Sequence, residues 1–361
     1  MTARRSELRI EYLPGSTGGG GGAAPEAAPE LVPYVEGVSV EDRSHGRADG
    51  ATLALSDADG RFSGRAAEGV PHWPISEGDR FRLSLLLVDW DAPGTSLLLP
   101  WGTFEADEVE HAGGSGGSTC TVRLQSASVL GSALGFRSTP RSEALGATTL
   151  QAAVVAACDR HGLGLSFLAA DMPLARGLEQ RAQPDAAFLR GLCERAGYHL
   201  AVREASAGIS VVVSDEAALA SGEAYRLTPE AARSWSFSRA VHGRFRAATC
   251  TYFDPRKGEA VEATVKGAGY TESSETLRVQ AVVASEAEAR RIARAALRRE
   301  NRAGVSARLS LSPGRPEATA GSVVECVGFG SDDGRYLVDV ARHRWRASGG
   351  FTTDLDLVGL P

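Results

Sequence analysis

The end of the chain carries the stretch that decides the fold class: residues 333–357 are DGRYLVDVARHRWRASGGFTTDLDL. Gly349-Gly350 predicts a turn, because glycine readily adopts the backbone angles that a hairpin needs. Every second residue from Phe351 to Leu357 is apolar or a threonine. Since successive side chains of a strand point to opposite faces, these residues are expected on one buried face. The stretch therefore predicts an antiparallel hairpin with one side in a core.

The same alternation of apolar and polar residues recurs in the first third and the last third of the chain. In the first third it predicts strands over residues 8–12, 35–40, 52–56, 81–89, 102–109 and 120–125. In the last third it predicts strands over residues 234–238, 245–254, 261–265, 277–283, 307–311, 323–327, 336–340 and 351–357. Short strands separated by turn signals are typical of barrels and sandwiches, so both regions are expected to be β-rich.

The middle of the chain has helical spacing instead. Apolar residues from Leu150 to Cys158 share one helical face, and Gly162 is expected to end that helix. A second helix is expected from Pro184-Asp185 to Gly197, since proline suits the first turn, a carboxylate there favours the helix dipole and glycine ends helices. His161 is expected to interact with the last carbonyls of the first helix. Residues 198–203 and 209–213 then predict a hairpin.

A further helix, at 286–303, is expected within the last third. Ser285 and Glu288 form an S-x-x-E capping box at its start. Its outer face is expected to carry Arg290, Arg291, Arg294, Arg298, Arg299 and Arg302. Such a face is either simply solvated or a contact with an acidic neighbouring subunit, and the sequence leaves both open.

These patterns predict a β-rich α+β fold in three parts. Residues 1–138 form a first β domain, with a glycine-rich insertion at 15–29 that is expected to be flexible. Residues 139–222 form a small α/β insertion, and residues 223–361 form a second β domain with its single helix. The chain of 361 residues is long enough for two or three domains.

The composition argues against two classes of partner. The formal net charge is −6, whereas a nucleic-acid binder usually shows a basic balance, so stable nucleic-acid binding is not expected. No apolar stretch approaches the ~20 residues that a membrane helix needs, and the first residues lack the apolar core of a secretion signal. The chain is therefore expected to have no membrane segment and to be made in the cytoplasm.

A search for catalytic chemistry finds little in the sequence. The five cysteines are widely spaced, at Cys120, Cys158, Cys193, Cys250 and Cys326, and are expected to be reduced thiols in the core. The seven histidines show no spacing typical of a local metal site. One G-x-S-x-G motif surrounds Ser115, but a predicted strand follows it where a nucleophile elbow requires a helix. A pair of catalytic carboxylates that are distant in sequence stays open, with nothing in its favour. We therefore expect no catalytic, cofactor or metal site, and a protein that is not an enzyme.

Three groups of residues carry a family resemblance. At the C-terminus, His343 and Trp345 precede the SGGF turn at residues 348–351, and Pro313-Gly314 and Ala320-Gly321 lie upstream. In the middle are Gln180, Pro184-Asp185, Phe188-Leu189, Leu192 and Gly197-Tyr198. A weaker N-terminal group comprises residues 38–42, 48–50, 53–57, 77–79, 101–104 and 107–108. With these groups the chain resembles the phage late-control protein D family, the tail hub proteins of contractile-tailed phages. These proteins are similar to the hub portion of type VI secretion spike proteins. Pro184 departs from the serine that the family usually has before the aspartate.

The resemblance implies a fold, an assembly and a set of partners. The fold would be two tube-like β-barrel domains with smaller inserted domains. Three chains would form a homotrimer whose six barrels adapt a sixfold tail tube to a threefold spike. The implied partners are a trimeric spike protein, a tail tube or tube initiator protein, baseplate wedge proteins and a tape measure protein. The chain would become part of the baseplate hub of a virion tail or injection particle.

Three other functions stay open at this stage. The same hub could serve a tailocin or an extracellular contractile injection system. A tail-associated cell-wall hydrolase would need an active-site cluster that the sequence does not show. A carbohydrate- or protein-binding β module would show clustered exposed aromatic residues. The tryptophans, Trp73, Trp90, Trp101, Trp235 and Trp345, are instead scattered through strand-like segments, as packing residues would be.

Overall fold

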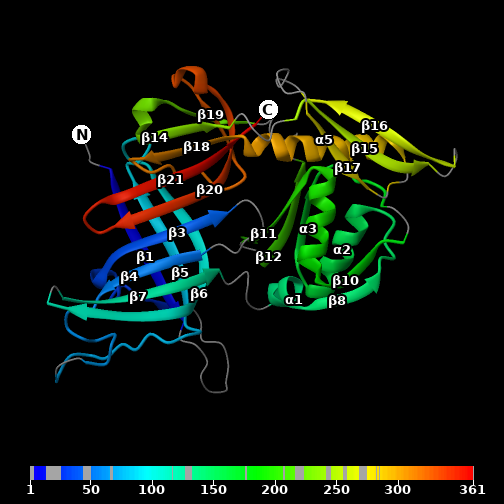
Figure 1. Cartoon of the computed structure of the whole chain (residues 1–361). Helices are drawn as coiled ribbons and strands as arrows, with labels where there is room; N and C mark the ends of the chain where they lie inside the picture. Colours follow the sequence, from blue (N-terminus) through cyan, green and yellow to red (C-terminus); the bar gives the residue numbers. More distant parts are fainter. Residues whose placement is uncertain are drawn as a thin grey trace.

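The computed structural model describes most of the chain (Figure 1). The described residues are 4–13, 26–43, 50–65, 68–115, 117–126, 132–174, 177–205, 208–215, 223–240, 245–254, 258–267, 275–281, 283 and 285–360. The glycine-rich insertion expected at 15–29 lies largely outside these residues. Of the described helices, none combines the length and the apolar character that a membrane crossing requires.

One 13-stranded sheet dominates the molecule. Its strands are β1 (Arg5–Leu13), β2 (Glu26–Ala27), β3 (Val35–Arg43), β4 (Gly50–Ser56), β5 (Arg80–Val88), β6 (Ser96–Gly114), β7 (Gly117–Ser126), β13 (Tyr225–Leu227), β14 (Ala232–Arg239), β18 (Val305–Leu311), β19 (Val323–Cys326), β20 (Gly334–Arg346) and β21 (Gly350–Gly359). The main path runs β14-β18-β21-β20-β3-β4-β7-β6-β5-β1-β2, and β19 links β13 to β20. Each strand predicted for the first third overlaps one of these, so the β-rich α+β class is confirmed.

The large sheet joins the two β-rich regions of the chain. The joint is the antiparallel pairing of β20 with β3, in which His343 lies opposite Val40. Each region nevertheless keeps its own hydrophobic core, one around β1 and β3–β7 and one around β18–β21. Two tube-like barrels were expected, but among the described strands the hydrogen-bond ladder closes no barrel. The ladder stays open because its two terminal strands, β14 and β2, do not pair with each other, and β20 links the two regions by pairing with β19 at one end and with β3 at the other.

The first half of the sheet curls back toward the β20–β21 hairpin. The indole Nε1 of Trp345 donates a hydrogen bond of 3.2 Å to the backbone oxygen of Ser6 on β1. The indole Nε1 of Trp90 donates one of 3.0 Å to the backbone oxygen of Gly314. Phe351 packs in the same core, 5.6 Å from Trp90 between ring centroids. These side-chain contacts hold the N-terminal part of the sheet, including β1, against the β20–β21 hairpin and the residues around Gly314.

The middle of the chain forms a small α/β unit. It contains α1 (Ser132–Ser138), β8 (Pro140–Ala144), α2 (Leu150–His161), β9 (Gly164–Leu168), β10 (Glu179–Pro184), α3 (Asp185–Ala196), β11 (Tyr198–Ala205) and β12 (Gly208–Asp215). Strands β11, β12 and β9 form one sheet and β10 and β8 another. Thr149 caps α2, its side chain accepting a bond from the Ala152 amide at 3.2 Å. Gly162 and Gly197 end the two predicted helices in the left-handed conformation, as expected.

A third layer lies beside the α/β unit (Figure 1). It comprises β15 (Ala247–Asp254), β16 (Glu259–Lys266), β17 (Thr276–Gln280) and α5 (Glu286–Ala303). These strands form a separate sheet with the order β16-β15-β17, and α5 packs on it around a core of its own. The Ser285 half of the predicted capping box is present, with the Glu288 amide donating to Ser285 Oγ at 3.3 Å. Short 3-10 turns lie at Val32–Tyr34, Pro229–Ala231 and Gly330–Asp332.

One arginine of α5 does not lie where the sequence placed it. Arg302 is 7% exposed, so it does not belong to the outer face. The last turn of α5 is enclosed because Asn301 holds the Phe245 backbone with two hydrogen bonds, of 2.8 and 2.9 Å. Arg290, Arg294 and Arg299 are exposed, and Arg291 and Arg298 are half-buried.

Candidate functional site

The cysteine side chains are buried and unsuited to nucleophilic chemistry. All five are free thiols in the core. Burial raises the pKa of Cys120 to about 11 and the pKa of Cys193 and Cys326 to about 12. Because the thiolate is the reactive form, these thiols are inert at neutral pH. They fill space in the cores, as the sequence predicted.

The histidine and serine side chains considered as candidate metal ligands or catalytic groups lie in surroundings that do not form such a site among the described residues. Within the described ranges, no group of three or more His, Cys, Asp or Glu side chains is arranged to hold a metal ion. His343 is buried between strands, with its Nδ1 3.1 Å from Thr353 Oγ1. Burial lowers the pKa of His343 to about 4, so its ring is neutral at pH 7. Ser115 lies at the end of the β6–β7 hairpin, between two strands and not before a helix.

A network of polar side chains surrounds Asp185 at the start of α3. Its Oδ2 accepts hydrogen bonds from Arg160 Nη1 at 2.7 Å and from His161 Nε2 at 2.8 Å. Its Oδ1 accepts a bond from Gln180 Nε2 at 2.9 Å, and Arg160 also reaches Glu143 at 3.0 Å. Burial by itself would raise the pKa of the Asp185 carboxyl, but these donors outweigh burial and hold it below its usual range. The network ties α2, α3, β8 and β10 together.

The network also corrects one expectation and explains a motif. The His161 ring bonds to Asp185 and not to the last carbonyls of α2, because α3 begins next to the end of α2. Gln180 and Asp185, which belong to the family-like group of the middle stretch, are paired with each other. Asp185 is only 2% exposed, so it is not accessible to a ligand. The role of Gln180 and Asp185 in the structure is therefore to position the helices.

The edge of the large sheet presents an aromatic surface. Strand β14 pairs with β18 on one side, and no other described strand pairs with it. On this strand Trp235 is 51% exposed. Its ring lies 5.5 Å from Phe329 and 6.0 Å from Phe237, measured between centroids, and Phe237 contacts Tyr336 at 5.6 Å. We call these four residues the β14 aromatic cluster. A half-exposed tryptophan on an open strand edge is typical of a protein interface.

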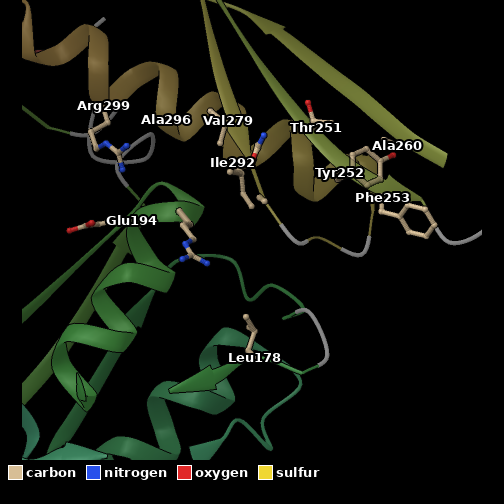
Figure 2. A pocket seen from close by; sticks show the side chains of 13 residues that line it. Leu178, Glu194, Thr251, Tyr252, Phe253, Ala260, Val279, Ile292, Ala296 and Arg299 are labelled. Carbon is tan, nitrogen blue, oxygen red and sulfur yellow. The ribbon is translucent and has the colours of Figure 1, made fainter. Parts of the chain in front are cut away.

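A cleft separates the α/β unit from the third layer (Figure 2). Its volume is about 680 Å³. Ile292, Val279 and Tyr252 face it from the third layer, and Leu178 faces it from the other side (Figure 2). Above the cleft the two parts touch, since a Cβ built on Gly197 would lie 3.1 Å from the Ala295 Cβ. A side chain at this position would be crowded against α5, and the φ of +79° also favours glycine there.

Sequence reasoning missed the two surfaces of greatest interest. Trp235 was taken for a packing residue, but it alternates with Ser234 and Ser236 on an edge strand. That alternation marks an apolar face, and only the tertiary structure shows that this face is partly open. The cleft had no sequence signal, because its walls come from segments that are far apart in the chain.

The sequence matches one family model over part of its length. Residues 192–340 match a family described as "Putative phage tail protein". The match covers part of α3, the third layer and most of the second β-rich region. No curated protein matches the sequence.

The fold matches solved tail proteins along almost the whole chain. A tail protein from Neisseria meningitidis MC58 has a TM-score of 0.64 at 12% identity and is matched over 97% of this chain and 96% of its own. The 43 kDa tail protein of prophage MuSo2 from Shewanella oneidensis has a TM-score of 0.65 at 12% identity, over 98% of both chains. The E. coli c3393 protein, a component of the type VI secretion system, has a TM-score of 0.52 at 13% identity, over 91% of this chain and 74% of its own. The resemblance to phage tail proteins that the sequence suggested is confirmed at the level of the fold.

Proposed function

We propose that this chain is a structural protein of a contractile tail, and that three copies form the hub of its baseplate. The observation that carries the proposal is the agreement in fold with two solved tail proteins, one of them from a prophage, over 97–98% of the chain. The family match over residues 192–340 supports the same class from the sequence alone. The hub would adapt a sixfold tail tube to a threefold spike.

The open edge of the large sheet supports self-association. Among the described strands, only β18 pairs with β14, so the other edge of β14 offers its backbone groups next to a half-exposed Trp235. Main-chain hydrogen bonds along such an edge give affinity, and a central aromatic side chain gives much of the binding energy. A contact from this edge to a different surface of the next copy is heterologous, and heterologous contacts form a ring when the rotation between copies closes. A trimeric ring is the smallest closed assembly that also matches a threefold spike.

The domain division and the partners are part of the proposal. The first β domain would be residues 1–138, the α/β insertion 139–222 and the second β domain 223–361. The partners would be a trimeric spike protein, a tail tube or tube initiator protein, baseplate wedge proteins and a tape measure protein. The protein would be made in the host cytoplasm and built into the tail. Contact with DNA would be limited to passage through the lumen.

The mass of the purified protein in solution tests the proposal. Light scattering coupled to size exclusion is expected to give three times the chain mass at micromolar concentration. Co-purification with the spike protein of the same gene cluster is expected as a second readout. A strictly monomeric protein that also fails to bind its spike would contradict the hub assignment.

Two related functions have separate tests. A type VI secretion component shares the fold, so the same hub in a tailocin or an extracellular injection system is the second candidate. Capsid and terminase genes beside this gene would indicate a phage, and their absence would indicate an injector. We propose that the protein is not an enzyme. Clearing of purified peptidoglycan that is lost on a single substitution would instead indicate a tail-associated hydrolase.

A further inference from the structure

We propose that the arginine row of α5, formed by Arg294 and Arg298, binds an acidic stretch of β6 in a neighbouring copy. The inference rests on the proposed trimer and names one of its contacts. The acidic stretch comprises Asp107, Glu108 and Glu110, which lie on β6 before the turn of the β6–β7 hairpin at Gly114 and Gly117. Each step below concerns the charge, the exposure or the spacing of these residues.

Among the described residues, no carboxylate offsets the positive charge of the arginine row. Helix α5 holds six arginines and three glutamates. Arg290 is held inside the chain by Glu286 at 2.8 Å and by the Thr264 backbone oxygen at 3.2 Å. Arg294 and Arg298 follow at four-residue steps on the same face, and in the described part of the chain neither has a carboxylate partner. These two guanidinium groups are free to bind an anionic surface.

The acidic stretch of β6 carries the opposite charge. Residues 105–126 contain four acidic side chains and one basic side chain, Arg123. Arg123 is shared between Glu108 and Glu110, and the Glu110 contact is long, at 3.7 Å. The side chains of these two glutamates are 52% and 54% exposed. One guanidinium therefore serves two accessible carboxylates and leaves negative charge on this surface.

The spacing of the two charge rows agrees. Glu108 and Glu110 lie on the same face of β6, because alternate residues of a strand point the same way. Side chains two residues apart on a strand are about 6.7 Å apart, and those four residues apart on a helix are about 6 Å apart. Two arginine–carboxylate pairs can therefore form side by side. Guanidinium groups bind carboxylates in a fixed geometry, so the paired contact would also set the register between copies.

The two surfaces lie on different sides of one molecule. The β6–β7 hairpin, which carries the acidic stretch, lies on the left of Figure 1, whereas α5 lies to the right of the large sheet. They cannot meet within one chain, so their pairing requires a second copy. A contact between two different surfaces repeats from copy to copy, and in the proposed trimer its rotation closes after three copies.

Charge reversal tests the contact. We compare the wild-type chain with R294E/R298E, with E108R/E110R, and with the combined variant that exchanges the charges. R181E/R278E is the matched control, since it reverses two exposed arginines outside both surfaces. Circular dichroism melting checks that each variant folds. Sedimentation equilibrium measures trimer dissociation at salt concentrations from about 0.05 to about 0.5 M, because exposed charges become screened over this range.

Each reversal is expected to raise the trimer dissociation constant at least about tenfold at low salt, the effect of losing two exposed ion pairs at the upper end of their usual strength. The combined variant is expected to restore assembly, and the control to behave as wild type. A trimer that is insensitive to both reversals would overturn this contact and leave the hub proposal standing. A wild-type chain that stays monomeric would overturn the trimer and this contact together.

Discussion

The large sheet and the α/β unit bury polar side chains in opposite ways. In the sheet, His343 is held neutral beside Thr353, because burial lowers the pKa of its ring to about 4. In the α/β unit, Asp185 is held charged by Arg160, His161 and Gln180. The sheet therefore depends on apolar packing around an uncharged group, whereas the α/β unit depends on a saturated ionic network. This difference predicts distinct responses to substitution and to acid.

The largest effect is expected from a cavity in the sheet. Phe104 is 1% exposed within the core around β1–β7. Phe104→Ala should lower the free energy of unfolding by about 4 kcal/mol, because the lost ring leaves a cavity. Urea denaturation followed by tryptophan fluorescence measures this. The exposed Leu98→Ala, on the neighbouring part of the same strand, is the control and should cost far less. Equal losses for the two would contradict a packing-dominated sheet.

Acid should weaken the sheet before it weakens the α/β unit. The pKa of His343 is lowered in the folded state, so the unfolded chain binds the proton first as the pH falls. Stability is complete above the ordinary histidine pKa and should fall by up to about 3 kcal/mol as the pH drops from about 6.5 to about 4. Urea titrations at several pH values test this, and His343→Gln should flatten the profile. The exposed His111→Gln should leave it unchanged.

A smaller loss is expected when the ionic network is broken. Asp185→Asn removes the charge that Arg160 faces and should cost about 2 kcal/mol at neutral pH, less than a fully buried pair because Arg160 is partly exposed. Hydrogen exchange of α2 and α3 amides locates the effect. The pKa of Asp185 is lowered on folding, so this stability persists above the ordinary carboxyl pKa of about 3.9 and disappears as the pH falls through the lower folded value. Glu179→Gln breaks an exposed pair and is the matched control; a loss as large as that of Asp185→Asn would contradict the network's role.

The smallest effect on stability is expected at the open edge of the sheet. Trp235 is half exposed, so Trp235→Ser should change the free energy of unfolding by less than about 1 kcal/mol. The same change should clearly weaken trimer formation, because exposed aromatic side chains carry much of the energy of interfaces. Sedimentation equilibrium beside urea denaturation separates the two quantities. A large loss of monomer stability with unchanged assembly would place Trp235 in the fold and not in an interface.

The strands and principal helices could be predicted because their patterns are local. The β21 alternation, the capping box at Ser285 and the glycine ends of α2 and α3 each lie within a few residues. Strand β20 was expected to be much shorter, at 336–340. Its arginines at 342 and 344 alternate with buried residues and face outward, where Arg342 bonds to Glu41 at 2.9 Å and to Asp356 at 2.8 Å. The alternation of these arginines with buried residues is a local signal for the longer strand, but their charged partners depend on the tertiary structure.

The joining of the two β regions could not be predicted from local patterns. The pairing of β3 with β20 depends on which strand edge meets which in the folded chain. The same holds for the separate third layer, because β15–β17 have the same alternation as the strands of the large sheet. The candidate interaction surfaces could not be predicted from local patterns either. Trp235 and the arginine row were visible as residues, but their exposure is a property of the complete fold.

The β3–β20 pairing also sets the order of events during synthesis. Strand β3 leaves the ribosome early, but its partner is made close to 300 residues later, a delay of about 15 to 60 s at ordinary bacterial rates of elongation. During that time one edge of the β3–β4 hairpin has no native neighbour, and an unpaired edge invites pairing with other nascent chains. Closing so long a loop also slows folding after release. Production of this protein should therefore depend on chaperones or slow translation, and a truncation before β20 should accumulate as aggregate.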